Sequence, residues 1–224
     1  MKKFALLLLT SAFAAVSFAA DKEVEELLAK MRTKYKDIGS VTFVLEATIT
    51  ADNGDVTVKM DGGFKSPNLM YADITAENET AKVVCDGLKI YAIAADSKQV
   101  LEIPYNVDNM GRVLMGANLE VINCYDWKRQ LSTAAGDNMH DSKLSLRKNV
   151  KWNNKTWTVL EESAPTVGVY VEYYIDPKTN LVWRTVQMSL DKEFISGDFI
   201  IKAMKTGAKI DAKKFKKPVL TAAS

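Results

Sequence analysis

The amino-acid sequence predicts an α+β protein that is mainly antiparallel β: one large curved sheet of about eleven strands, with an N-terminal helix and a helical insertion. Three observations support this fold class. Helical periodicity marks residues 21–38, segments of alternating polarity then follow one another with short turns between them, and alternation stops once, over about residues 106–136. Because no helical crossover separates successive strands, neighbouring strands should be antiparallel.

The first 19 residues have the pattern of a secretory signal peptide. Two lysines open it, residues 4–16 are almost wholly apolar, and Ser17 and Ala19 are small residues at the −3 and −1 positions of a cleavage site. The apolar run is too short for a good membrane anchor. We therefore expect a signal peptide over residues 1–19, a single domain over residues 20–218 and a C-terminal tail over residues 219–224.

The segment from Asp21 to Ile38 is predicted to be an amphipathic helix. Its apolar residues recur at helical spacing, its acidic residues cluster early and its basic residues late, which suits the helix dipole. Gly39 and Ser40 end it. The residues expected on its buried face are Val24, Leu27, Leu28, Met31, Tyr35 and Ile38.

Strands are predicted directly after the helix. Residues 41–50 alternate between apolar odd positions and mostly polar even positions, with Val44 the exception, which is typical of a strand with one wet face. Asp52-Asn53-Gly54-Asp55 is a strong tight-hairpin signal. Further strands are expected at residues 56–64, 69–75, 81–85, 88–94 and 99–103.

The stretch from Asn106 to Gly136 lacks alternation and is predicted to form one or two short helices. Strand patterns then resume. Asp176-Pro177-Lys178-Thr179-Asn180 has proline where a type I turn prefers it, so the strands on either side of this turn should pair. The strands of this second half are expected at residues 143–150, 156–161, 167–175, 181–190 and 194–204.

Charge and composition exclude several functions. The chain has 30 lysines and arginines against 28 aspartates and glutamates, so it lacks the basic excess with which proteins grip nucleic acid. His140, the one histidine, follows a Gly-Asp-Asn-Met loop and is expected to be a solvated loop residue rather than a base, so we expect no Ser/His/Asp or Cys/His arrangement. No phosphate loop or HExxH motif occurs. The acidic residues near Asp52 and Asp61 have the wrong spacing for a calcium loop. We expect no enzyme activity, no cofactor and no metal.

Two further features leave alternatives open. Cys85 and Cys124 could form a disulfide that closes a loop of about 40 residues and adds roughly 3–4 kcal/mol of stability, or could be two buried free thiols. The segment Lys202–Lys217 holds seven lysines and one acidic residue. This excess could meet anionic headgroups or an acidic partner, or could be a solvated last strand and tail whose lysines protect an open sheet edge.

Five segments, in the right order, resemble the periplasmic outer-membrane lipoprotein carrier family. They are Leu27–Met31 with Val41–Phe43, Gly63–Tyr71, Val83–Tyr91, Ile175–Leu181 and Gly207–Pro218. The resemblance implies an incomplete, strongly curved barrel whose apolar concave face shelters acyl chains and whose opening is covered by lid helices, where the 106–136 insertion falls. It also implies an arginine before the proline of the second segment, which holds the lid shut in the family. This chain has Ser66 there.

Few special residues are needed to shelter an acyl chain, because burial gains about 0.8 kcal/mol per CH2 and on the order of 10 kcal/mol for 14–18 carbons. The alternative for each candidate is ordinary core packing. The candidate wall residues are Phe43, Leu45, Met60, Tyr71, Ile90, Val171, Trp183, Met188 and Phe199. The candidate lid residues are Met110, Val113, Leu114, Ile122 and Trp127.

Two functions follow from these observations. The first is a soluble periplasmic carrier of a lipidated protein or lipid, monomeric, which exchanges its cargo with membrane-bound donor and acceptor proteins. The second is an envelope module on the same fold that senses a ligand or binds a protein partner through the sheet edge or the lid, without transport.

Overall fold

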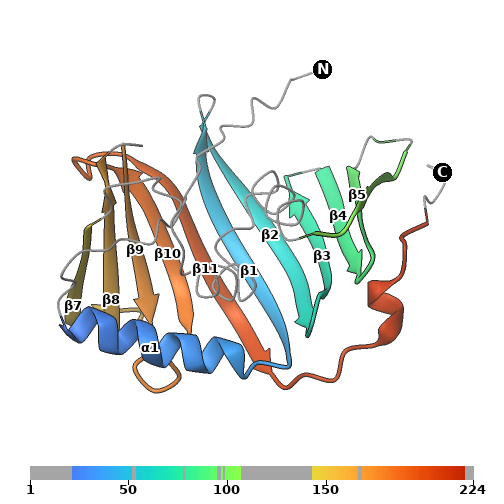
Figure 1. Cartoon of the computed structure of the whole chain (residues 1–224). Coiled ribbons are helices and arrows are strands. Elements are labelled where there is room, and N and C mark those ends of the chain that lie inside the picture. The colour runs from blue at the N-terminus through green and yellow to red at the C-terminus, as the bar shows by residue number, and fades with distance from the viewer. Residues whose placement is uncertain are drawn as a thin grey trace.

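A computed structural model gives the fold (Figure 1). It describes residues 22–51, 54–77, 79–94, 97, 99–106, 143–165 and 168–219. Three predicted features therefore lie outside the described residues: the signal peptide, the helical insertion beyond residue 106 and most of the C-terminal tail.

The predicted N-terminal helix is confirmed as α1, Lys22–Lys36. Val24, Met31 and Tyr35 are buried on one side of it, while acidic residues occupy its first turn and basic residues its last turn. The Tyr35 hydroxyl accepts a hydrogen bond from the Val182 amide at 3.0 Å, which ties the helix to the start of a strand in the second half of the chain. In Figure 1 the helix runs along one end of the sheet.

All eleven predicted strands are confirmed, and they form one antiparallel sheet. The turn residues explain where the strands end; Gly54, for example, has a φ of 110°, which glycine adopts without strain. The strands are β1 Ser40–Ala51, β2 Gly54–Lys65, β3 Leu69–Ala76, β4 Glu79–Asp86, β5 Lys89–Ala94, β6 Leu101–Pro104, β7 Lys143–Trp152, β8 Lys155–Ala164, β9 Val169–Ile175, β10 Val182–Ser189 and β11 Ile195–Thr206.

Two meanders, β1–β6 and β7–β11, join through their first and last strands. The strand order is β6-β5-β4-β3-β2-β1-β11-β10-β9-β8-β7, and β1 pairs with β11 from Val41–Thr206 to Ile49–Gly197. Strands β6 and β7 are the two edges, so the sheet does not close into a barrel. The idea that the lysine-rich C-terminal segment protects an edge is wrong for β11, which is a central strand.

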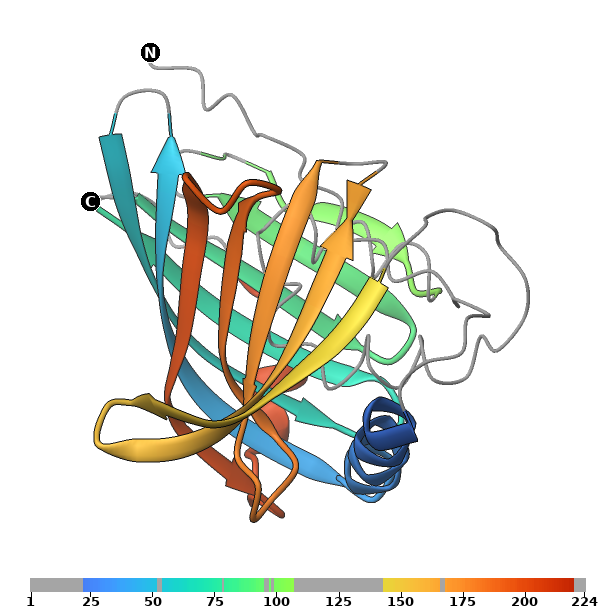
Figure 2. The ribbon, with the colours of Figure 1, turned by 90° about the vertical axis from the view of Figure 1, so that its left-hand side faces the viewer.

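The sheet bends around the side on which α1 lies (Figure 2). We call this side the concave face. Two apolar clusters cover it: a helix-side cluster, in which α1 packs against β1, β2 and β8–β10, and a wall cluster on β1–β5 and β11. Two smaller clusters lie on the outer face. Both faces of the sheet therefore contain buried apolar side chains.

The β7–β8 hairpin curls over the outer face (Figure 2). Its strand pairing shifts after Arg147, and Asn149 has a φ of 59°, as expected where a bulge bends a strand. The curl brings Trp152 onto Tyr174, with ring centroids 5.6 Å apart. Arg184 lies 4.9 Å from both ring centroids and makes two 2.8 Å bonds to Asp198.

The C-terminal strap, residues 207–219, crosses the outer face of β3–β5 (Figure 1). It contains the 3-10 helix η3, Ala212–Phe215, whose Phe215 side chain is buried beside Tyr71 with ring centroids 6.0 Å apart. Lys214 pairs with Asp73 at 3.2 Å and lies over the Tyr71 ring. Part of the lysine excess is therefore used within the protein itself, in ion pairs that hold this strap.

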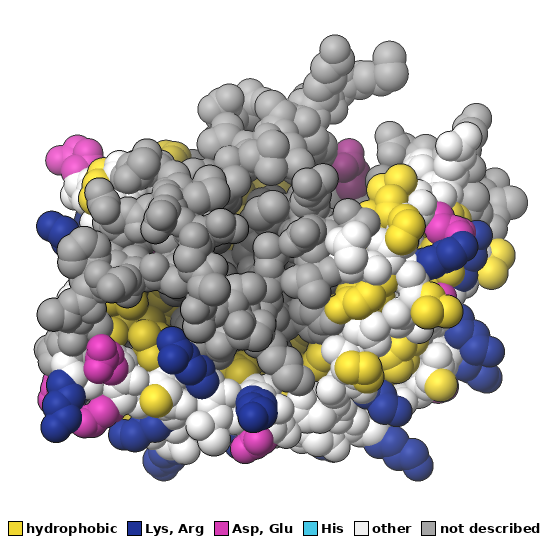
Figure 3. Space-filling model, viewed as in Figure 1, with side chains coloured by type: hydrophobic (Ala, Val, Ile, Leu, Met, Phe, Trp, Pro, Cys, Tyr) yellow, Lys and Arg dark blue, Asp and Glu magenta, His cyan; other side chains and the backbone are white. Residues whose placement is uncertain are grey.

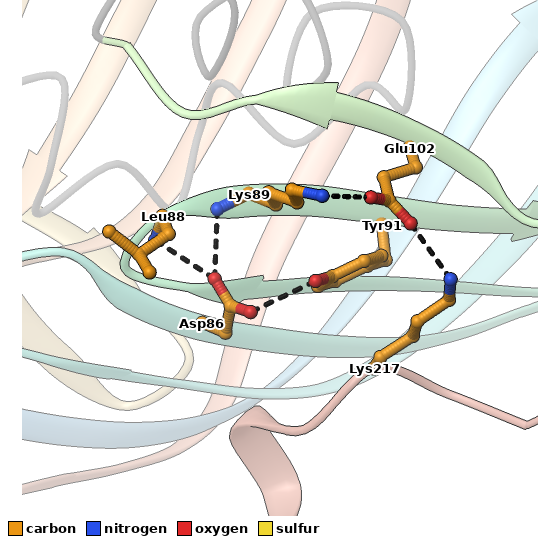
Figure 4. Close-up of polar contacts among 6 residues, drawn as sticks. All are labelled: Asp86, Leu88, Lys89, Tyr91, Glu102 and Lys217. Carbon is orange, nitrogen blue, oxygen red and sulfur yellow. Dashed lines mark hydrogen bonds and ion pairs between the residues drawn. The ribbon is translucent and has the colours of Figure 1, made fainter.

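Carboxylates at the end of the sheet complete the strap's attachment (Figure 4). Asp86 accepts hydrogen bonds from two backbone amides of the β4–β5 turn at 2.8 Å and from the Tyr91 hydroxyl at 3.0 Å. Glu102 on β6 pairs with Lys89 on β5 and, at 2.8 Å, with Lys217 of the strap. The strap is thus bonded to both β3 and β6.

Candidate functional site

The wall cluster on the concave face is the candidate site. It contains five of the nine predicted wall residues, and hydrophobic side chains gather on this face over β3–β5 (Figure 3). Its buried members are Phe43, Leu45, Ala47, Met60, Met70, Ala72, Ile74, Val83, Cys85, Ile90, Phe199 and Ile201.

The other four predicted wall residues lie elsewhere. Val171 belongs to the helix-side cluster. Trp183 packs against both concave clusters and also against the outer-face cluster that contains Met188. Tyr71 and Met188 lie on the outer face, Tyr71 beneath the strap and Met188 beside Trp157. The reason is strand alternation: the neighbours of Tyr71 on β3, Met70 and Ala72, face the wall, so Tyr71 faces away from it.

A row of small side chains crosses the middle of the wall. Strand pairing places Gly62, Ala72, Val83 and Ala92 side by side on β2, β3, β4 and β5. We call these four residues the small-residue row. Three strand spacings of about 4.8 Å make it roughly 14 Å long. On one side it is flanked by Phe64, Met70, Cys85 and Ile90. On the other side it is flanked by Met60 and Ile74 on β2 and β3, and by Ala81 and Ala94 on β4 and β5.

Two aromatic rings of the wall lie flat against glycines. A Cβ placed on Gly62 would be 2.3 Å from Cζ of Phe43, and one on Gly197 would be 2.6 Å from Cε2 of Phe199. Phe43 on β1 covers a glycine of the neighbouring strand β2, a known way in which aromatic rings shield strand glycines, whereas Phe199 covers a glycine of its own strand, β11. Both rings therefore lie along the sheet rather than standing up from it, which keeps the wall low where phenylalanines would otherwise be its tallest side chains.

Buried polar groups of the concave face gather on β8–β10, beside the wall. The indole nitrogen of Trp183 and the hydroxyl of Thr185 are buried and have no hydrogen-bond partner among the residues that the structure describes. Thr185 is 1% exposed and pairs with Phe199 of the wall. Gln187 and Glu162 are also buried, and the Glu162 carboxylate accepts a 3.1 Å hydrogen bond from Tyr173. A polar border thus adjoins the apolar wall along β10.

Cys85 lies in the wall as a buried free thiol. Burial raises its pKa to about 11. The disulfide considered from the sequence is thus not formed at Cys85, and Cys124 lies outside the described residues. So do His140 and all the predicted lid residues, Met110, Val113, Leu114, Ile122 and Trp127.

Ser66, at the position of the family's lid-holding arginine, is exposed in the turn between β2 and β3. Its backbone amide donates a 2.8 Å hydrogen bond to the carbonyl of Gly39, next to the end of α1. A serine hydroxyl cannot supply the forked, charged donors of a guanidinium. A lid on this chain cannot therefore be held shut by an arginine at this position.

Chemistry-bearing groups other than these are sparse in the described ranges. Within residues 22–106 and 143–219, less the few gaps given above, no three His, Cys, Asp or Glu side chains converge as a metal site. No helix in this same part of the chain is long and apolar enough to cross a membrane. What the described site offers is an apolar surface with two buried, unpartnered polar atoms at its border.

Sequence reasoning missed the small-residue row and Thr185. A signal for the row was present in Gly62-Gly63, since two glycines inside a strand indicate close approach of another group. No local signal distinguishes Thr185 from any other strand threonine.

No protein-family model matches the sequence, and no curated protein matches it. Similar solved structures include MucB, with a TM-score of 0.49 and 12% sequence identity over 88% of this chain and 63% of the MucB chain. A putative outer membrane lipoprotein-sorting protein domain from Vibrio parahaemolyticus has a TM-score of 0.41 and 10% identity, over 85% of this chain and 94% of that chain. The LolA superfamily protein NE2245 from Nitrosomonas europaea has a TM-score of 0.40 and 10% identity, over 86% of this chain and 97% of that chain. This chain spans less than two thirds of the MucB chain. Solved structures similar to this chain thus include lipoprotein-sorting and LolA-superfamily proteins, and the likeness is one of fold alone.

Proposed function

We propose that this chain is a periplasmic carrier that shelters the acyl chains of a lipoprotein or another lipid on the concave face of its sheet. The observation that carries the proposal is the small-residue row, a low apolar strip bordered by Phe64, Met70 and Ile90 on one side and, at its β2–β3 end, by Met60 and Ile74 on the other. An extended hydrocarbon chain is narrow and apolar along its length, so a strip of this shape suits it better than it suits a compact ligand.

The dimensions agree with an acyl chain. The row is roughly 14 Å long from β2 to β5, and an extended chain advances about 1.3 Å per carbon because its 1.5 Å bonds zigzag. About eleven methylene groups would therefore lie on the row. Their burial would contribute on the order of 9 kcal/mol before the costs of ordering the chain.

The leader predicted over residues 1–19 supports a place beyond the inner membrane. A carrier there would take its cargo from a membrane-bound donor and release it to an acceptor. Because the chain lacks an arginine at Ser66, we propose that its release differs from that of the family's arginine-held lid.

A matched pair of variants on β5 tests the proposal. Ala92 belongs to the small-residue row, and the next residue, Ile93, lies on the other face of the same strand; both are half-buried. Ala92→Glu should lower the affinity for a fluorescent dodecanoyl probe at least tenfold, because the chain would have to bury a carboxylate without a partner. Ile93→Glu should bind as the parent protein does.

Both variants must first be shown to fold, by circular dichroism and thermal unfolding. Lipid extracted from the purified parent protein and analysed by mass spectrometry gives a second test, since a carrier should retain acyl lipid. Unchanged probe binding by a folded Ala92→Glu protein would show that the wall does not hold the chain.

A protein-binding module on the same fold is the alternative. It is favoured by β6 and β7, which are the outermost of the described strands, since a strand at the edge of a sheet can pair with another chain. Such a module should keep its partner when Ala92 becomes Glu. Loss of acyl binding in that variant, together with an acyl-bearing parent protein, separates the carrier from this alternative.

A further inference from the structure

The boundary between the apolar wall and β10 contains two polar atoms that have no hydrogen-bond partner in the described part of the chain. The indole nitrogen of Trp183 and the hydroxyl of Thr185 are both buried without a hydrogen-bond partner. A buried donor without a partner is costly and uncommon in folded proteins, so each such group calls for an explanation. Two of them on alternate residues of one strand, beside a candidate ligand surface, point to a ligand that supplies the missing partner.

The local backbone places these two side chains at the wall. Strand β10 shifts register against β9 between Val182 and Arg184, so no residue of β9 lies opposite Trp183. Bulges of this kind often aim a side chain at a functional site. Thr185 pairs with Phe199, whose ring is part of the wall. Alternate strand residues lie about 6.6 Å apart on one face, so a single small group could lie near both.

The surrounding charge argues for a neutral acceptor. Glu162 is 4% exposed on the same face, and the described residues of the wall cluster and of the concave positions of β10 include no lysine or arginine. A free carboxylate placed there would lie near the Glu162 carboxylate and would find no cation among these described residues, which is unfavourable in a poorly solvated site. An ester or amide carbonyl accepts hydrogen bonds without carrying charge.

We propose that the cargo is an acyl ester or acyl amide rather than a free fatty acid, and that Trp183 and Thr185 donate hydrogen bonds to its carbonyl oxygen while its hydrocarbon lies on the wall. This inference rests on the proposed function. It adds a polar anchor that sets where along the wall the acyl chain begins, and it predicts a preference for acyl-linked over ether-linked chains of equal length.

The test compares 1-dodecanoylglycerol with 1-dodecylglycerol, which differ in the carbonyl oxygen alone, by displacement of a fluorescent probe from the full chain. The parent protein should bind the ester about five- to fiftyfold more tightly than the ether, since two hydrogen bonds are lost with the carbonyl. Thr185→Val and Trp183→Phe should each lower the ratio of ester affinity to ether affinity about two- to tenfold, because each removes one donor to the carbonyl oxygen. Dodecanoate at pH 8 should bind more weakly than the ester.

Stability provides an independent measurement. Thr185→Val removes an unpartnered hydroxyl and keeps the side-chain shape, so the ligand-free variant should be as stable as the parent protein or more stable. A large loss of stability would mean that the hydroxyl has a partner within the protein, and would overturn the inference. Equal binding of ester and ether by the parent protein, or dodecanoate binding as tightly as the ester, would overturn it and leave the carrier proposal standing. If neither glycerol probe binds, the carrier proposal itself fails.

Discussion

The contact between Phe43 and Gly62 gives the sharpest test of the wall. A methyl group added at Gly62 would lie 2.3 Å from Cζ and 2.5 Å from Cε2 of the Phe43 ring, and 3.2 Å from the carbonyl oxygen of Tyr71. Contacts this short cannot be tolerated, so Gly62→Ala must lift the ring off the sheet. Overpacking of a buried site costs about 1–3 kcal/mol, and each kcal/mol should lower the Tm by about 2–4 °C in a domain of this size.

A double-mutant cycle isolates this contact. Urea unfolding would be measured for Gly62→Ala, Phe43→Leu and the combined variant. Once the ring is gone, the added methyl has room, so the combined variant should be at least about 1 kcal/mol more stable than the sum of the single effects implies. Gly39→Ala is the control, because nothing lies within 4 Å of its added Cβ and its φ is not positive; it should be neutral or slightly stabilising.

Additive effects, within about 0.5 kcal/mol, would refute the reasoning, because they would mean that the ring does not lie on Gly62. The cycle also has a functional counterpart. A ring lifted by Gly62→Ala would stand over the small-residue row, so the variant should bind dodecanoylglycerol more weakly, and the combined variant should recover part of that binding.

Three further predictions concern the strap and the thiol. Phe215→Ala should lower the free energy of unfolding in urea by about 3–5 kcal/mol. The loss should be smaller if the strap opens on its own, and trypsin should then cut the strap faster than in the parent protein. No change in either measurement would mean that Phe215 does not anchor the strap. Burial acts to raise the pKa of Asp73, but hydrogen bonds from two lysines, one of them Lys214, outweigh burial and lower that pKa. The contribution of the ionised Asp73 to folding stability is therefore complete above about pH 4, the pKa of an unfolded aspartate, and is lost as the pH falls through the lower pKa of the folded protein. Asp73→Asn should therefore be less stable than the parent protein at pH 7 and equally stable near pH 2, and a difference that does not change with pH would contradict this. In a Cys124→Ser protein at pH 8, a thiol reagent should react with Cys85 about a hundredfold or more slowly in the folded protein than in the unfolded protein. The reason is that a thiol with a pKa of about 11 is rarely ionised at that pH. Equal rates would show that the thiol is exposed.

Local patterns in the sequence were sufficient for the elements. The spacing of apolar residues predicted α1, and the alternation in Val41–Thr50 predicted β1 and the side of it that is buried. The turn signals at Gly54 and Pro177 predicted where strands reverse. These predictions succeed because helical and strand periodicities are properties of a few neighbouring residues.

The site was predicted only in part, because facing the wall depends on register between strands. Tyr71 is as apolar as its neighbours on β3, and nothing within that strand indicates that it faces the strap instead of the wall. The shift of β10 against β9 beside Trp183, and the flat position of Phe43 on Gly62, likewise depend on pairings between strands.

The sequence by itself determined the helix, the eleven strands, their antiparallel direction and the apolar character of one face, since each follows from residues close together in the chain. The tertiary structure alone decided that β11 pairs with β1 at the centre of the sheet and which four small residues line up across β2–β5. It also decided that two polar atoms of β10 are buried at the β11 border of the wall. The physical reason is that pairing between distant strands depends on the free energy of the whole packed sheet, and a shift of one residue would turn every side chain of a strand to the other face.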